Sequence, residues 1–151
     1  MRVWKTIFRL LTFRITREEI GQFDKRHFAA GLTGTWIVGM GRYWDDERAG
    51  LLQHLGLGSV IYIFVLAASI WLIIKPFPAD KWDYFTVVTF IGLTSFPAIL
   101  YTIPVEKFVS IGTANKINVW FLAIVAAWRL LLLNYFLRRF TRLSYGNILT
   151  V

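Results

Sequence analysis

The chain contains no cysteine and only two histidines, His27 and His54, which limits the metal and redox sites that it can build. Without cysteine there are no disulfides and no thiolate metal ligands. The two histidines leave a bis-histidine metal or haem site open, with positions at helix ends as the alternative. The HExxH, GxSxG and Walker-loop patterns are also absent. We therefore expect no cofactor, and an enzyme is the less favoured class.

Acidic residues are scarce, with nine Asp and Glu against 17 Lys and Arg, for a formal net charge of +8. In a soluble protein this excess of basic residues would suggest nucleic acid as the binding partner. However, hydrophobic residues make up 56% of the chain, above the roughly 45–50% of soluble globular proteins. The basic excess then indicates an anionic membrane surface as the partner, and no nucleic acid. Basic residues also interrupt the N-terminal region, which predicts no cleaved secretory signal.

Three windows are long, apolar and nearly free of charge: residues 55–74, 84–105 and 117–137, the last interrupted only by Arg129. As helices they would each be about 30 Å long, which matches the hydrocarbon core of a bilayer. A fourth window, residues 28–41, would span only about 21 Å and contains four glycines. It is interpreted as a short tilted span, a re-entrant segment or a packed helix, with Ala30 and Gly34 spaced for close helix contact.

The predicted fold is all-α: a polytopic integral membrane helical bundle over residues 1–151, with three or four transmembrane helices. Residues 1–27 form its cytoplasmic basic region. Within it, residues 3–15 have apolar side chains on one helical arc, with Arg2, Lys5 and Arg9 opposite. Such a helix lies in the membrane interface with its basic face toward phospholipid headgroups, and packing on a protein is the alternative. Thr16 and Glu19 have capping-box spacing, which predicts a bend and a new helix there.

The distribution of Lys and Arg predicts a cytoplasmic N-terminus in either topology. With four passes, including residues 28–41, 12 basic residues lie inside and 4 outside. With three passes the counts are 11 and 5. Charge thus slightly favours four passes, whereas the length of the fourth window favours three.

Two features outside the charged termini are candidate functional positions. Asp45, Asp46 and Glu47 look like the start of a helix that runs to about residue 55, because acidic side chains favour helix N-termini. Clustered carboxylates at a membrane surface are also ligands for Mg²⁺, so a metal or headgroup site is the functional interpretation.

Pro97 lies near the middle of its window and should bend the helix, as a hinge or as a packing feature. Thr94 and Ser95 can satisfy the backbone groups that the bend frees.

The polar residues of window 117–137 are the candidate intramembrane site: Arg129, with Asn118 and Asn134. An arginine at the centre of a membrane helix costs about 2.5–3.5 kcal/mol on insertion scales, so it needs a compensating environment. One interpretation is snorkelling toward the headgroups. The other is a protein partner or wet cavity, the partner being a carbonyl freed by Pro97, the carboxylate of Glu106, or a carboxylate on another subunit.

The stretch HFAAGLTGTWIVGMGRYWDDERAGLLQHLGLGSVIYIFVL, and further on IPVEKF, resembles uncharacterised bacterial multi-span inner-membrane proteins. The resemblance implies a cell inner (plasma) membrane location and brings no activity, cofactor or site with it. Residues 143–151 are apolar and follow a basic segment, which suggests that the chain continues in a longer parent protein.

Three functions remain open from the sequence. The first is a non-enzymatic subunit, scaffold or assembly partner of a membrane complex, with a membrane-protein partner or a second copy of the chain. The second is a channel or transporter component that uses Arg129, Asn118, Asn134 and Pro97. The third is a metal-dependent lipid-headgroup enzyme that uses Asp45, Asp46 and Glu47.

Overall fold

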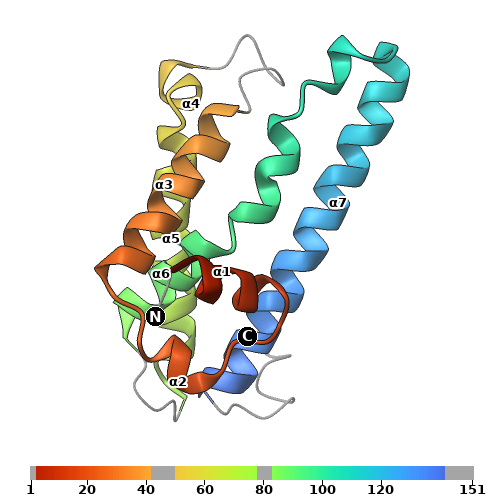
Figure 1. The fold of residues 1–151 in the computed structure, drawn as a ribbon. Coiled ribbons are helices and arrows are strands. Elements are labelled where there is room, and N and C mark those ends of the chain that lie inside the picture. Colours follow the sequence, from red (N-terminus) through yellow and green to blue (C-terminus); the bar gives the residue numbers. More distant parts are fainter. Residues whose placement is uncertain (1–2, 42–49, 78–82, 142–151) are drawn as a thin grey trace.

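The computed structural model describes residues 3–41, 50–77 and 83–141, and every regular element in these ranges is helical (Figure 1). The all-α prediction is therefore confirmed. Elements η2 and η3 are 3₁₀ helices and η4 is a π-helical turn. In chain order the elements are α1 (Val3–Leu11), α2 (Arg17–Ile20), α3 (Lys25–Gly41), α4 (Leu51–His54), α5 (Leu57–Ile74), α6 (Tyr84–Leu93), η2 (Phe96–Thr102), η3 (Val105–Lys107), α7 (Ile111–Phe136) and η4 (Leu137–Thr141).

Helix α6 is the centre of the bundle, and α3, α5 and α7 surround it. Its residues from Thr86 to Leu93 are all buried, because it packs against α3 on one side and α5 on another. On the α7 side, the rings of Phe90 and Phe136 stack with centroids 4.0 Å apart. A mostly apolar helix suits this central position, and only its first turn, at Phe85, is exposed.

Helices α3 and α6 run side by side in the same direction. A Cβ added to Gly31 would lie 2.9 Å from the backbone of Gly92, and one added to Gly41 would overlap the side chain of Thr102. The backbones can approach this closely only because the contact residues lack side chains. Gly34 packs against the Phe96 ring, as the predicted small-residue contact requires, whereas Ala30 is only half-buried.

The bend predicted at Pro97 is present as a change of helix type. Helix α6 ends at Leu93, and the chain continues as η2 with Pro97 in its first turn. The hydroxyls of Thr94 and Ser95 donate to the carbonyls of Ile91 and Gly92 at 2.8 and 2.6 Å. These bonds satisfy the end of α6, as the sequence predicted. A functional hinge at Pro97 stays a prediction.

The N-terminal helix is shorter than predicted, ending at Leu11 rather than at residue 15. Phe13 adopts a left-handed conformation, with φ of 58°. The amides of Phe13 and Arg14 donate to the carbonyls of Leu10 and Arg9, which is the hydrogen-bond pattern of a Schellman C-cap. The predicted capping box comes next, with Thr16 and Glu19 each bonded to the other's backbone amide.

The N-terminal segment lies against the side of the bundle. Thr6, Ile7 and Leu10 face inward and are buried. The Trp128 indole donates to the Leu11 carbonyl at 3.1 Å, and the Tyr135 hydroxyl donates to the Ile15 carbonyl at 2.8 Å. The inner face of α1 is thus used within the protein. Its membrane-surface role stays a prediction.

Three helices are long and apolar enough to cross a membrane: Leu57–Ile74, Tyr84–Lys107 and Ile111–Thr141. They correspond to the three predicted windows, although the last begins six residues before residue 117. Lysine and asparagine ended the apolar window there, but neither ends a helix. The short window 28–41 belongs to α3, which begins at Lys25.

The helix predicted to begin in the acidic cluster is seen only in part. Gly56, with φ of 70°, separates α4 from α5, so the apolar window 55–74 becomes a helix only from Leu57. Asp45, Asp46 and Glu47 lie outside the described residues. The metal or headgroup interpretation of these three residues therefore stays a prediction.

Candidate functional site: the Arg129 cleft

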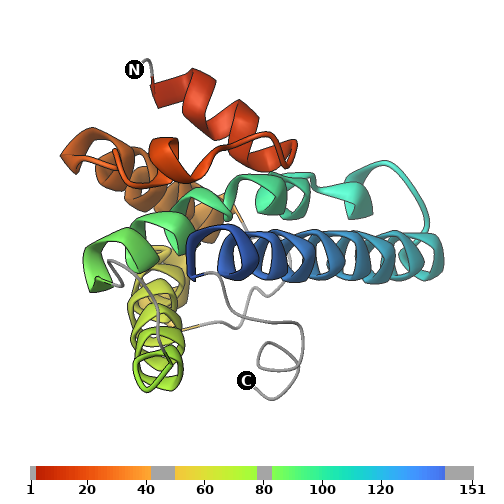
Figure 2. The same cartoon turned by 90° about the horizontal axis from the view of Figure 1, so that it is seen from below.

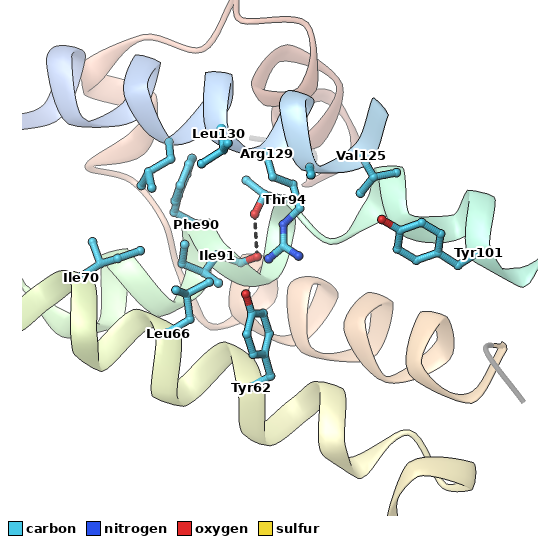
Figure 3. A pocket seen from close by; sticks show the side chains of 12 residues that line it. Tyr62, Leu66, Ile70, Phe90, Ile91, Thr94, Tyr101, Val125, Arg129 and Leu130 are labelled. Atoms are coloured by element: carbon cyan, nitrogen blue, oxygen red, sulfur yellow. Dashed lines mark hydrogen bonds between the residues drawn. The ribbon is translucent and has the colours of Figure 1, made fainter. Parts of the chain in front are cut away.

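Arg129 lies in a cleft between α5 and α7, and α6 forms its floor. Viewed from below, α5 (yellow-green) and α7 (blue) point in different directions (Figure 2). The cleft has a volume of about 350 Å³. Residues spaced by four line each wall, since these share a helix face. The residues that line it, ten of them labelled in Figure 3, are Tyr62, Leu66 and Ile70 of α5, Phe90, Ile91 and Thr94 at the floor, Tyr101 of η2, and Val125, Ala126, Arg129, Leu130 and Leu133 of α7. We call this space the Arg129 cleft.

The guanidinium of Arg129 reaches across the cleft toward α5. Its central carbon lies 5.9 Å from the centroid of the Tyr62 ring, which is within the range of a cation–π interaction (Figure 3). The ring partly compensates the cation, and the arginine remains half-buried. Within the part of the chain that the structure describes, no carboxylate lies within ion-pair distance of Arg129.

Two of the partners predicted for Arg129 are not found. Glu106 accepts a hydrogen bond from the Asn118 side-chain amide at 2.6 Å instead. Among the described residues, no hydrogen bond joins the guanidinium to a carbonyl at the bend, where Thr94 and Ser95 donate to the carbonyls of Ile91 and Gly92. The third predicted partner, a carboxylate on another subunit, stays a prediction.

The predicted polar residues of α7 therefore divide between different places. Asn118 faces η3 and ties it to the start of α7 through Glu106. Asn134 is half-buried and is not among the residues that line the cleft. Of the three, only Arg129 lies in the cleft. The helical stripe that connects Asn118 to Arg129 passes Leu122, which is exposed.

The lining residues of the cleft are suited to binding an anion. Arg129 offers up to five N–H donors and a permanent positive charge. Most of the remaining lining is aliphatic or aromatic carbon, and the Thr94 hydroxyl is already bonded to the Ile91 carbonyl. Among the lining residues there is no carboxylate, histidine or lysine that could act as a general base. This combination suits an anionic group that carries an apolar portion.

A second polar cluster, around His27, was not predicted as a unit. His27 is buried, its Nδ1 lies 2.7 Å from the Asp24 carboxylate, and its Nε2 lies 3.2 Å from the Thr6 hydroxyl. Asp24 also accepts from the backbone amides of Arg26 and His27. These bonds, the backbone bond of His27 first and its side-chain bond next, hold the pKa of Asp24 below its ordinary value. The sequence clue was an Asp three residues before a His at a helix start.

The bis-histidine site is not supported by the arrangement of the helices. His27 lies near the start of α3, whereas His54 ends α4. The turn after α4, at Gly56, packs on Trp36 and Met40 near the far end of α3. About 20 Å of helix separates the two ends. Within residues 3–41, 50–77 and 83–141, no group of three metal-ligating residues occurs.

Part of the predicted basic arc of α1 serves a different purpose. The Arg9 side chain lies 3.2 Å from the Glu19 carboxylate and also donates to the Arg14 carbonyl at 2.9 Å. It therefore joins α1 to α2. Lys5 remains exposed, and Arg2 lies outside the described residues.

Comparison of the chain with known protein families, with curated proteins and with solved structures found no match. A functional interpretation therefore depends on the geometry of the cleft and the physical chemistry of its residues.

Proposed function

We propose that the chain is an integral protein of a bacterial inner membrane that crosses the bilayer four times, with its N-terminal region in the cytoplasm. The parallel packing of α3 and α6 supports four passes over three. If α6 with η2 spans the membrane, α3 lies at the same depth, because Gly31 meets Gly92 and Gly41 meets Thr102. At 17 residues α3 would be about 25 Å long, near the lower limit for a spanning helix.

The arrangement of charge supports the same topology. In Figure 1, α2, the start of α3 and η4 lie at one end of the bundle, and α4 and η3 lie at the other. The first end carries Lys25, Arg26, Lys75, Arg138 and Arg139. Cytoplasmic loops carry an excess of Lys and Arg, so this end faces the cytoplasm.

Within that membrane, we propose that the chain is a non-enzymatic subunit or assembly partner of a membrane complex. The observation that carries this proposal is Arg129, a cation in an apolar cleft whose only compensation among the described residues is the Tyr62 ring. A charge within a membrane span is costly, and such residues usually bind a partner, an ion or a ligand. The cleft gives this cation the surroundings of an anion-binding site.

The test is co-purification in mild detergent. Arg129→Leu should insert into the membrane at least as well as the wild type but lose the co-purifying partner. Arg129→Lys should retain part of the co-purifying partner. Arg138→Leu, at an exposed arginine beyond α7, is the matched control and should keep the partner. If Arg129→Leu keeps its partners and the cellular phenotype of the wild type, the functional role of Arg129 is wrong.

A channel or transporter component is the second candidate. The observation that favours it is the change of helix type between Leu93 and Phe96, beside Thr94 on the floor of the cleft. Interrupted helices at binding sites are common in transporters. This function requires ion or solute flux in liposomes that contain the purified chain, and flux that survives Arg129→Leu and Pro97→Ala would exclude the proposed site.

A further inference from the structure

We propose that the Arg129 cleft binds an anionic amphiphile, with its acidic head at the guanidinium and its apolar chain between α5 and α7. The inference rests on the proposed membrane location and deepens the anion-binding role of Arg129. The head could be a lipid phosphate or the carboxylate of a fatty acid. Both present the oxygens that a guanidinium binds in bidentate geometry.

The size of the cleft is that of a small-molecule site. Its volume is about 350 Å³. Small-molecule sites begin at about 300 Å³ and are mostly apolar with a few polar groups. A single acyl chain with an acidic head is a ligand of this class.

The composition of the walls matches the proposed occupant. Leu66 and Ile70 on α5 face Leu130 on α7, and Phe90 and Ile91 form the floor between them (Figure 3). Leu133 of α7 also lines the cleft. The cation lies at one position along this apolar surface. A free inorganic anion would leave the apolar surface uncovered, and an uncharged chain would leave the cation without an anion. Only a ligand with both parts is complementary to the whole cleft.

Arg129 lies at about the same position along the bundle as the end of the charged N-terminal helix α1. Trp128, the adjacent residue, donates to the Leu11 carbonyl where α1 ends. Arg14 lies three residues further along the chain and is exposed. An acidic head at the cytoplasmic side of the bilayer thus has only a short distance to reach the guanidinium, which can also extend toward it.

The experiment measures spin-label immobilisation on the full chain in nanodiscs of zwitterionic lipid. The probes are spin-labelled stearate, phosphatidylglycerol and phosphatidylcholine. We expect the wild type to immobilise one or both anionic probes in preference to phosphatidylcholine. Stearate alone identifies a fatty-acid site, phosphatidylglycerol alone identifies a phospholipid site, and equal binding of these two identifies recognition of the shared charge. Equal immobilisation of all three probes would overturn the proposal.

Two pairs of variants separate the contribution of the Arg129 charge to binding from the contribution of the space in the cleft. Arg129→Leu should reduce the affinity for the anionic probes about tenfold or more, the loss expected for a hydrogen bond between charged groups. Arg138→Leu should leave it close to the wild-type value. Ala126→Trp should fill the cleft and remove the immobilised population, whereas Ala127→Trp, on the exposed surface of α7 outside the cleft, should preserve it. An anionic preference that survives both Arg129→Leu and Ala126→Trp excludes this site.

The same variants distinguish failure of this inference from failure of the proposed function. If Arg129→Leu loses its partner protein but the wild type shows no anionic preference, the subunit role stands and the lipid site is wrong. If the probes bind through Arg129 while Arg129→Leu keeps its partner, the lipid site stands and the role of Arg129 in assembly is wrong.

Discussion

Tyr135 holds the N-terminal segment on α7 through one hydrogen bond, to the Ile15 carbonyl at 2.8 Å, while its ring contacts Phe13 edge-to-face. Tyr135→Phe should keep the ring contact and lose about 1 kcal/mol of unfolding free energy, the usual net value of such a bond. Chemical unfolding in detergent measures the change.

The matched control for that substitution is Tyr62→Phe. The Tyr62 ring faces Arg129, but its hydroxyl makes no hydrogen bond to the described residues, so removing it should change stability little. Equal losses for the two variants would show that the bond from Tyr135 contributes nothing specific.

Asp24 links protonation to stability. Bonds from the His27 backbone amide and side chain lower its folded pKa below the ordinary value of 3.8. The stabilisation is therefore fully present above the unfolded pKa and is lost as the pH falls through the folded value. Asp24→Asn should keep an N-cap but abolish this acid-side change. Titration of the carboxyl carbon by NMR checks it directly, and a midpoint at or above 3.8 would contradict the assignment.

Single residues were predictable where their partners are close in sequence. Thr16 and Glu19 meet through backbone spacing alone, so the capping box could be predicted from four residues. Arg129 and Tyr62 lie on different helices. Their contact depends on which helices pack together and on how each helix is rotated about its own axis. The sequence showed that Arg129 needs compensation, but it could not identify the ring that provides it.

The contact between α3 and α6 depends on the absence of a side chain at Gly31. A Cβ there would lie 2.9 Å from backbone atoms of Gly92 and Leu93, so the helices would have to move apart. Gly31→Ala should cost about 1–3 kcal/mol, even though alanine favours a helix over glycine by about 1 kcal/mol. Thermal unfolding in detergent measures the loss.

Gly112 is the control for Gly31 because a Cβ there meets no atom within 4 Å. Gly112→Ala lies in the first turn of α7 and should be neutral or stabilising by up to about 1 kcal/mol. If Gly31→Ala is equally neutral, the close approach of α3 and α6 is not under steric restriction at this point.

Elements were predictable where composition alone determines them. Mean hydropathy located the three long helices because apolar residues dominate each window. The end of α1 was missed because Phe13 adopts a conformation that usually takes glycine. The start of α7 at Ile111 was missed because Asn115 and Lys116 ended the apolar window, although neither residue ends a helix.

At the scale of the whole molecule, the four-pass topology makes a clear prediction. The chain has no native cysteine, so single cysteines report position without background. Gly50→Cys and Ser110→Cys should react with an impermeant thiol reagent in intact cells, whereas Lys75→Cys should react only after the membrane is opened. All three positions are exposed. The reverse pattern would contradict a four-pass topology with a cytoplasmic N-terminus.

The close pairing of α3 with α6 also has a consequence for biosynthesis. The ribosome completes α3 and α5 before it begins α6. The glycine face of α3 therefore has no helix to pack against when it leaves the ribosome. A short helix with four glycines is a weak candidate for independent entry into the bilayer. We therefore expect α3 to enter the bilayer only after α6 has arrived. In chains stalled before residue 84 the Gly50 side should remain accessible from the cytoplasm, and it should cross the membrane only once α6 has been made.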